Sequence, residues 1–84
     1  MDMKEILAHR MQQLGYSQYK LTQEVCKLRS EDGDVPPVLK YNSSIGKALN
    51  DPDNVKLYII EDIVNALGGE IIIRWNNPQE IRVD

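Results

Sequence analysis

Residues 42–52 of this chain, Asn-Ser-Ser-Ile-Gly-Lys-Ala-Leu-Asn-Asp-Pro, decide the fold that we expect. Ile45, Ala48 and Leu49 recur three and four residues apart, so a helix over them buries one stripe of side chains. Turn-forming residues follow directly and end the helix. The stretch therefore predicts a short amphipathic helix over about residues 43–50.

The surface of this helix is unusual because its side chains are small and polar. A helix kept for stability alone more often carries Glu, Lys and Ala outside, since these have better helix propensity. Ser43 or Ser44 can cap the helix N-terminus. The polar positions are Asn42, Ser43, Ser44, Gly46, Lys47 and Asn50. Such groups donate and accept hydrogen bonds, which suits recognition of base edges in a DNA major groove. The alternative interpretation is that this helix face only contacts solvent.

Length and composition indicate one small domain. The chain has 84 residues, 42% of them hydrophobic, and a net charge of −3. Residues 1–50 carry seven basic and six acidic side chains, whereas residues 51–84 carry three and seven. Contact with phosphate is therefore expected from the first part of the chain. The lone Cys26 makes no intramolecular disulfide, and neither a signal peptide nor a membrane-length apolar run is visible, so we expect a cytoplasmic protein without membrane contact.

Hydrophobic spacing predicts three further helices. The first spans Met3–Leu14, with Ile6, Leu7, Met11 and Leu14 on one face and Gly15 as its C-terminal cap. The second spans Gln18–Leu28 after Ser17, with Leu21, Val25 and Leu28 inward. The last covers residues 57–67 and is closed by two glycines. Residues 30–41 are expected to form a loop that Val38 and Leu39 pin to the core.

The pattern changes after Gly69. Residues 70–75 form an apolar, β-branched run that predicts a strand. Residues 76–79 suggest a turn, and residues 80–83 alternate as a half-buried strand does. A lone hairpin is marginal in water, so these strands need the helices or a second copy of themselves. We therefore expect a single domain over residues 1–84, helical over 1–68 with a β extension over 69–84.

Three segments in order resemble the Xre family of helix-turn-helix proteins, the repressors of the phage lambda type. Tyr16-Ser17-Gln18-Tyr19-Lys20-Leu21 looks like the start of its first motif helix. Residues 42–51 look like its recognition helix, and residues 57–68, ending Ala-Leu-Gly, look like the helix that follows. The resemblance implies a mainly α, four-helix, lambda-repressor-like domain that binds double-stranded DNA in a sequence-specific way as a small transcriptional regulator.

The resemblance also assigns candidate contacts. Asn42, Ser43, Ser44 and Lys47 are expected to face the groove, and Asn50 to reach the backbone just beyond the helix. Gln18 is expected to approach a phosphate or to support Asn42. Among the nearby cations, Lys20 and Lys40 are candidates for phosphate contact.

Two features distinguish the chain from the family. The connection between the motif helices is longer than the family's tight turn and carries Glu31, Asp32 and Asp34, so we expect it to loop outward. The strand at residues 70–75 resembles an extension seen in antitoxins of this family, which can pair across a dimer. One recognition helix gains little affinity alone, and two copies can read successive major-groove faces of a palindrome. We therefore expect a homodimer, with Ile71, Ile73 and Trp75 as dimerisation residues and the fourth helix beside them.

Other functions remain as alternatives. One is an antitoxin that binds DNA and a toxin partner, and another is a protein-interaction adaptor that has lost DNA binding, which the acidic insert favours. An enzyme is not expected, since no catalytic set, zinc spacing or phosphate loop is visible, and neither a cofactor nor a metal is expected. Asp32-Gly33-Asp34 resembles the start of a calcium-binding EF-hand loop. Counted from Asp32, however, the fifth residue is Pro36 and the twelfth is Ser43, where such a loop needs an oxygen ligand and a bidentate Glu, so a calcium site is not expected.

Overall fold

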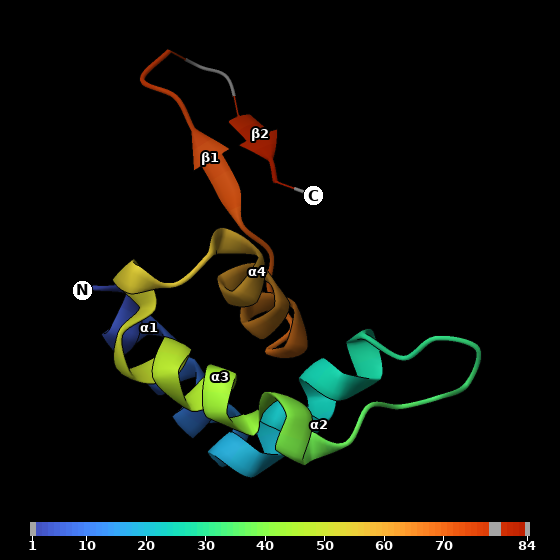
Figure 1. Cartoon of the computed structure of the whole chain (residues 1–84). Coiled ribbons are helices and arrows are strands. Elements are labelled where there is room, and N and C mark those ends of the chain that lie inside the picture. The colour runs from blue at the N-terminus through green and yellow to red at the C-terminus, as the bar shows by residue number, and fades with distance from the viewer. Residues whose placement is uncertain (1, 78–79, 84) are drawn as a thin grey trace.

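The computed structural model describes residues 2–77 and 80–83, and it shows a mainly helical domain followed by a small β-hairpin (Figure 1). Its elements are α1 (Met3–Leu14), α2 (Gln18–Leu28), α3 (Val38–Asn50), a short 3-10 helix η1 (Pro52–Asn54), α4 (Leu57–Ala66), β1 (Ile72–Arg74) and β2 (Glu80–Arg82). The helical part and the C-terminal β element thus follow the order that the sequence predicts. Within the described residues no helix is both long enough and apolar enough to span a bilayer.

The first two helices have the predicted bounds because local signals fix both ends. Asp2 caps α1 through its side chain, which accepts a hydrogen bond from the Glu5 amide at 2.9 Å. Gly15 closes α1 in the left-handed conformation, with φ at 70°. Ser17 caps α2 by accepting from the Lys20 amide at 3.1 Å.

Helix α3 starts earlier than expected, which corrects the prediction of a loop over residues 30–41. It begins at Val38, directly after Pro37, and no side chain caps it. Proline suits this position because its φ is already fixed and it lacks an amide that would need a partner. Ser43 and Ser44 therefore lie inside the helix, and the prediction that either caps it is wrong.

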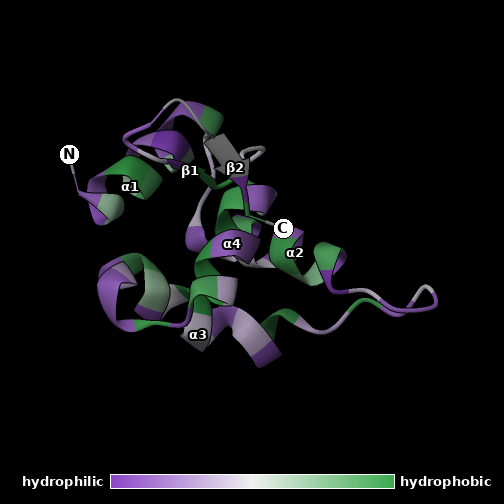
Figure 2. Cartoon of the chain, turned by 90° about the horizontal axis from the view of Figure 1, so that it is seen from above, coloured by the Kyte–Doolittle hydropathy of each residue, from purple (hydrophilic) through white to green (hydrophobic). Residues whose placement is uncertain are grey.

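The connection between α2 and α3 is a narrow protrusion that extends away from the helical body (Figures 1 and 2). Glu31 and Asp34 exchange backbone hydrogen bonds of 3.1 and 2.8 Å. Asp32 and Gly33 between them both have positive φ, 50° and 84°. Asp-Gly is the preferred pair for such a two-residue turn, because it tolerates left-handed backbone at both positions. The expectation that the insert loops outward is confirmed.

One apolar core joins the four α-helices. Its buried members are Leu7, Leu21, Val25, Ile45, Ala48, Ile60, Ile63 and Leu67. Cys26 is buried as well, and desolvation raises the pKa of its thiol.

Several apolar residues that were predicted to point inward, four of them from the helical pattern and Leu39 as an anchor of the 30–41 loop, lie at the surface instead. Leu28 is 53% exposed and Leu39 is 90% exposed, so neither packs into the core. Ile6, Leu14 and Leu57 are exposed too.

The hairpin pairs β1 with β2 in antiparallel register, Ile73 opposite Ile81. Strand β1 is shorter than the predicted 70–75, and every one of its residues is exposed. Ile71, just before it, is half-buried and packs against the helical core. Part of the predicted turn, residues 78 and 79, lies outside the described residues.

Candidate nucleic-acid interface

Helix α3 presents a continuous exposed surface along one side. It is formed by side chains spaced three, four and seven residues apart, so they share a face of the helix. We call this surface the outer α3 face; its members are Leu39, Lys40, Ser43, Ser44 and Lys47, all exposed. The opposite side carries Ile45 and Ala48, which are buried in the core. Four of these five residues are among the predicted DNA contacts, and they lie together.

Within the part of the chain that the structure describes, the side chain of Lys47 is exposed and makes neither an ion pair nor a hydrogen bond, so its ammonium group is available to a ligand. Lys40 lies 5.5 Å from the centre of the Tyr41 ring, and its charge also stays at the surface. Leu39 adds a large apolar group that is almost fully exposed. The sequence pattern missed this residue, because an isolated leucine beside a valine is more often buried than exposed.

The side chain of Asn42 is half-buried and turns toward α2, so Asn42 is not a member of the outer α3 face, and its contact with the groove stays a prediction. Its side-chain oxygen accepts hydrogen bonds from the Gln18 amide at 3.3 Å and from the Thr22 hydroxyl at 3.2 Å. The Gln18 amide also donates to the Asn42 backbone carbonyl at 3.1 Å. Of the two roles predicted for Gln18, the structure therefore shows support of Asn42.

Gly46 of α3 lies directly against the side chain of Gln18 in α2. A Cβ built on Gly46 would lie 2.8 Å from the Gln18 amide nitrogen. A larger residue would push the Gln18 side chain away and cost it the hydrogen bonds to Asn42. Gly46 thus belongs to the contact between the two helices and not to their exposed polar surface.

Arg29 ties the end of α2 to both α3 and α4. Its guanidinium group donates from Nε to the Asp62 carboxylate at 3.0 Å, and from Nη2 to the same oxygen. The guanidinium carbon lies 4.8 Å from the Tyr41 ring centre and 5.5 Å from that of Tyr58. The hydrogen bond with Asp62 raises the pKa of Arg29, so the charge persists. This half-buried cluster fixes the direction in which α3 leaves the loop.

Lys20 is less available than predicted. Its ammonium group lies 3.5 Å from the carboxylate of Glu24, which also pairs with Lys27 at 3.1 Å. The hydrogen bond from Lys27, with Lys20 adding to it, lowers the pKa of Glu24. At neutral pH one carboxylate therefore offsets part of the charge of both lysines.

Asn50, at the C-terminal end of α3, is exposed, and its side-chain oxygen accepts a hydrogen bond from Lys4 at 3.4 Å. A groove of about 310 Å³ runs between α3 and the segment leading into α4. It is lined by Ser44, Lys47, Asn54, Val55, Lys56, Tyr58 and Ile59. Lys47 and Lys56 thus line the same groove. Lys56 was not among the predicted DNA contacts, because the sequence alone does not show how η1 brings the start of α4 beside α3.

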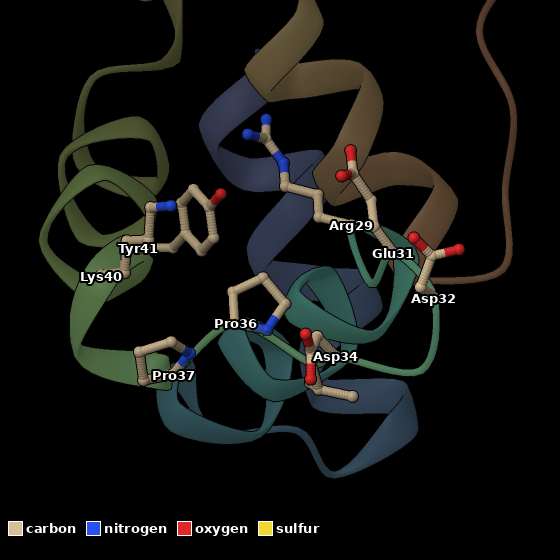
Figure 3. A pocket seen from close by; sticks show the side chains of 9 residues that line it. Arg29, Glu31, Asp32, Asp34, Pro36, Pro37, Lys40 and Tyr41 are labelled. Carbon is tan, nitrogen blue, oxygen red and sulfur yellow. The ribbon is translucent and has the colours of Figure 1, made fainter.

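A second, larger cavity of about 510 Å³ lies at the base of the protruding loop (Figure 3). Glu31, Asp32 and Asp34 line it from the loop, and Lys40 and Tyr41 line it from α3. The acidic loop therefore adjoins the N-terminal end of the outer α3 face. No group of three His, Cys, Asp or Glu residues among the described ones could hold a metal ion.

The residues predicted for dimerisation lie apart from these features. Ile73 and Trp75 are exposed on the hairpin, whereas Ile71 packs against the core of its own chain. Comparison with known proteins adds no assignment: no family model, no curated protein and no solved structure matches this chain.

Proposed function

We propose that this protein is a sequence-specific DNA-binding regulator of the helix-turn-helix class, similar to the Xre family, with α2 and α3 as the motif helices. The single observation that carries the proposal is the outer α3 face, which is exposed along about two and a half turns and combines hydroxyl, ammonium and apolar groups. A major groove admits an α-helix, and these are groups that contact base edges there. A repressor-like role follows if the bound site overlaps a promoter.

The contacts inside the protein support this proposal by fixing α3 against α2. Gln18 holds Asn42 and packs on Gly46, and Arg29 holds Tyr41. A recognition helix must be rigidly placed, because a small misplacement removes the hydrogen bonds that distinguish one base from another. Asn42 then contributes to DNA binding through the position of α3.

The hydrogen-bonding groups and polarity of each side chain on the outer α3 face indicate which part of the DNA it contacts. Lys47 can donate to guanine, and Ser43 and Ser44 can donate or accept at either kind of base pair. Leu39 suits the methyl group of thymine, because apolar contact is the only feature of that base edge that a leucine can recognise. Lys40 and Lys56 flank these residues and supply phosphate contacts.

The test begins with selection of bound duplexes from a random pool, followed by fluorescence anisotropy on the selected site. Lys47→Ala is expected to weaken specific binding by about 1–3 kcal/mol and to relax preference at one base pair. Lys27→Ala is the matched control, since Lys27 pairs with Glu24 on α2. An unchanged affinity and preference for Lys47→Ala, or no enrichment of any duplex, contradicts the proposal.

Salt dependence provides an independent measurement. Lys40 and Lys56 give two phosphate-directed cations for each protomer. Counterion release then predicts that log affinity falls against log salt with a slope of about −1.8 per protomer bound. A slope near zero removes phosphate contact from the proposal.

The acidic loop favours one second candidate, a protein-interaction adaptor without DNA binding. Its carboxylates lie beside the N-terminal end of the outer α3 face, where they oppose phosphate. Asp32→Asn with Asp34→Asn distinguishes the two functions. If the protein binds DNA, this neutralised variant binds the selected duplex more tightly, whereas the adaptor binds no duplex with either loop.

A further inference from the structure

A groove with an apolar floor lies between α1 and α4. Its volume is about 310 Å³, near the lower end of the range of about 300–1,000 Å³ for small-molecule sites. Leu7 and Leu67, which belong to the buried core, line it together with Val64 and the 46% exposed Ile6. We call this site the α1–α4 groove. None of the described residues that line it belongs to α3, so it is separate from the outer α3 face.

Three polar side chains of α1 also line the groove, and hydrogen bonds link them. The amide nitrogen of Gln13 lies 3.3 Å from Nε2 of His9, and Nη1 of Arg10 donates to Oε1 of Gln13 at 3.4 Å. Nε of Arg10 donates to the Leu67 carbonyl, at the end of α4, at 3.0 Å. The guanidinium group is therefore held at the groove before a ligand binds, which lowers the entropic cost of binding.

Arg10 has no acidic partner among the described residues: no carboxylate there forms an ion pair with it, and none lines the α1–α4 groove. Glu70, just beyond the groove, is paired with Arg82 at 3.1 Å. A guanidinium group has more N–H donors than the two that bond Leu67 and Gln13. Arg10 therefore keeps donors for an anion, and a carboxylate can accept two of them in parallel.

The size of the groove favours a slender ligand over a protein segment. Its α1 side runs from Ile6 to Gln13, which is about 10 Å along the helix axis. An α-helix with its side chains is about 10–12 Å in diameter, so a helical segment of that length has more volume than the groove. An extended hydrocarbon chain is narrow enough to lie along the groove with one end beside Arg10.

We propose that the α1–α4 groove binds a free amphipathic carboxylate with an unbranched hydrocarbon chain of medium length. The chain lies against Ile6, Val64 and Leu67, and its removal from water supplies affinity. The carboxylate accepts hydrogen bonds from Arg10, whose charge selects an anionic head group over a cationic one. Binding needs neither DNA nor α3, so the failure of this proposal and that of the proposed function are distinguishable.

Two probes with the same chain and opposite charges, octanoate and octyltrimethylammonium, test the site on the wild-type chain. Titration of ¹⁵N-labelled protein with each of them, below micelle-forming concentrations, measures both affinity and location. We expect octanoate to bind about tenfold more tightly, because only its head group accepts from Arg10. The largest amide shift changes should fall on residues 6–13 and 64–69.

Three results of this titration overturn the proposal. Equal affinity for the two probes shows that the groove recognises the chain alone. Octanoate-induced changes centred outside residues 6–13 and 64–69, or none at the highest soluble concentration, remove the site. Shifts at these residues that depend on protein concentration without a probe show that a second copy covers the groove.

Arg10→Gln tests the guanidinium group, since it removes the charge and keeps an amide donor. Its affinity for octanoate is expected to fall about tenfold, and its affinity for octyltrimethylammonium is not. Lys27→Gln is the matched control, because it removes a cation that pairs with Glu24 on α2. Far-ultraviolet circular dichroism checks that both variants keep their helical content. Undiminished octanoate binding by Arg10→Gln, or an equal loss in Lys27→Gln, overturns the proposal; if Arg10→Gln does not fold, the comparison of the two probes on the wild-type chain decides.

Discussion

Replacing Arg29 with Met tests the cluster that holds α3 in place. The substitution keeps most of the apolar stem and removes the guanidinium group. That group donates twice to Asp62 and lies against the rings of Tyr41 and Tyr58. Its loss disconnects the end of α2 from both following helices.

The size of the effect follows from these contacts. A hydrogen bond to a charged group contributes about 1.5–3 kcal/mol, and each cation–π contact adds about 0.5–1 kcal/mol. Since the contributions overlap, we expect the free energy of unfolding to fall by about 3 kcal/mol. For a domain of this size, that lowers the unfolding midpoint by about 12–24 °C.

Thermal unfolding followed by far-ultraviolet circular dichroism measures this shift. Lys27→Met is the matched control, because it also removes a cation from α2, but Glu24 keeps Lys20 as a partner. The control is expected to leave the midpoint near that of the wild type. If Arg29→Met lowers the midpoint no further than Lys27→Met does, the cluster does not hold the helices together.

Two more substitutions separate contact with DNA from support of the fold. Leu39→Ala is expected to leave stability unchanged, because Leu39 is exposed, and to reduce preference for thymine at one position by about 1 kcal/mol. Leu28→Ala is the control and should change neither quantity. A thymine preference that Leu39→Ala leaves as strong as in the wild type contradicts the role of Leu39. Asn42→Ala should lower the free energy of unfolding by about 1 kcal/mol, since two hydrogen bonds are lost and some helix propensity is gained. Ser43→Ala should leave the free energy of unfolding near that of the wild type. Urea titration measures both variants, and a larger loss of stability in Ser43→Ala than in Asn42→Ala contradicts the prediction.

Local signals made α1 and α2 predictable to the residue. Asp2, Gly15 and Ser17 act on the backbone within a few positions, so their effect needs no knowledge of the rest of the chain. The start of α3 was mispredicted because the adjacent prolines were assigned to a loop through residue 41. Pro37 instead starts the helix, and Tyr41 extends its buried stripe by one turn.

The site was predictable only where it depends on helix geometry. Ser43, Ser44 and Lys47 share a face once a helix is assumed, so the structure brings them together. Asn42 turns inward because Gln18, distant in sequence, reaches it, and spacing within one helix cannot show that. The ion pair between Arg29, at the end of α2, and Asp62, in α4, joins residues that are separated in sequence by the whole of α3, so no local sequence signal predicts it.

We propose that the outer α3 face enters a DNA duplex. Titration of ¹⁵N-labelled protein with a selected duplex tests this contact, because amide chemical shifts report on each residue separately. We expect the largest changes on residues 39–47, with smaller ones near Lys56 and none centred on the hairpin. Changes confined to the hairpin or the acidic loop, or none at saturating duplex, would contradict it.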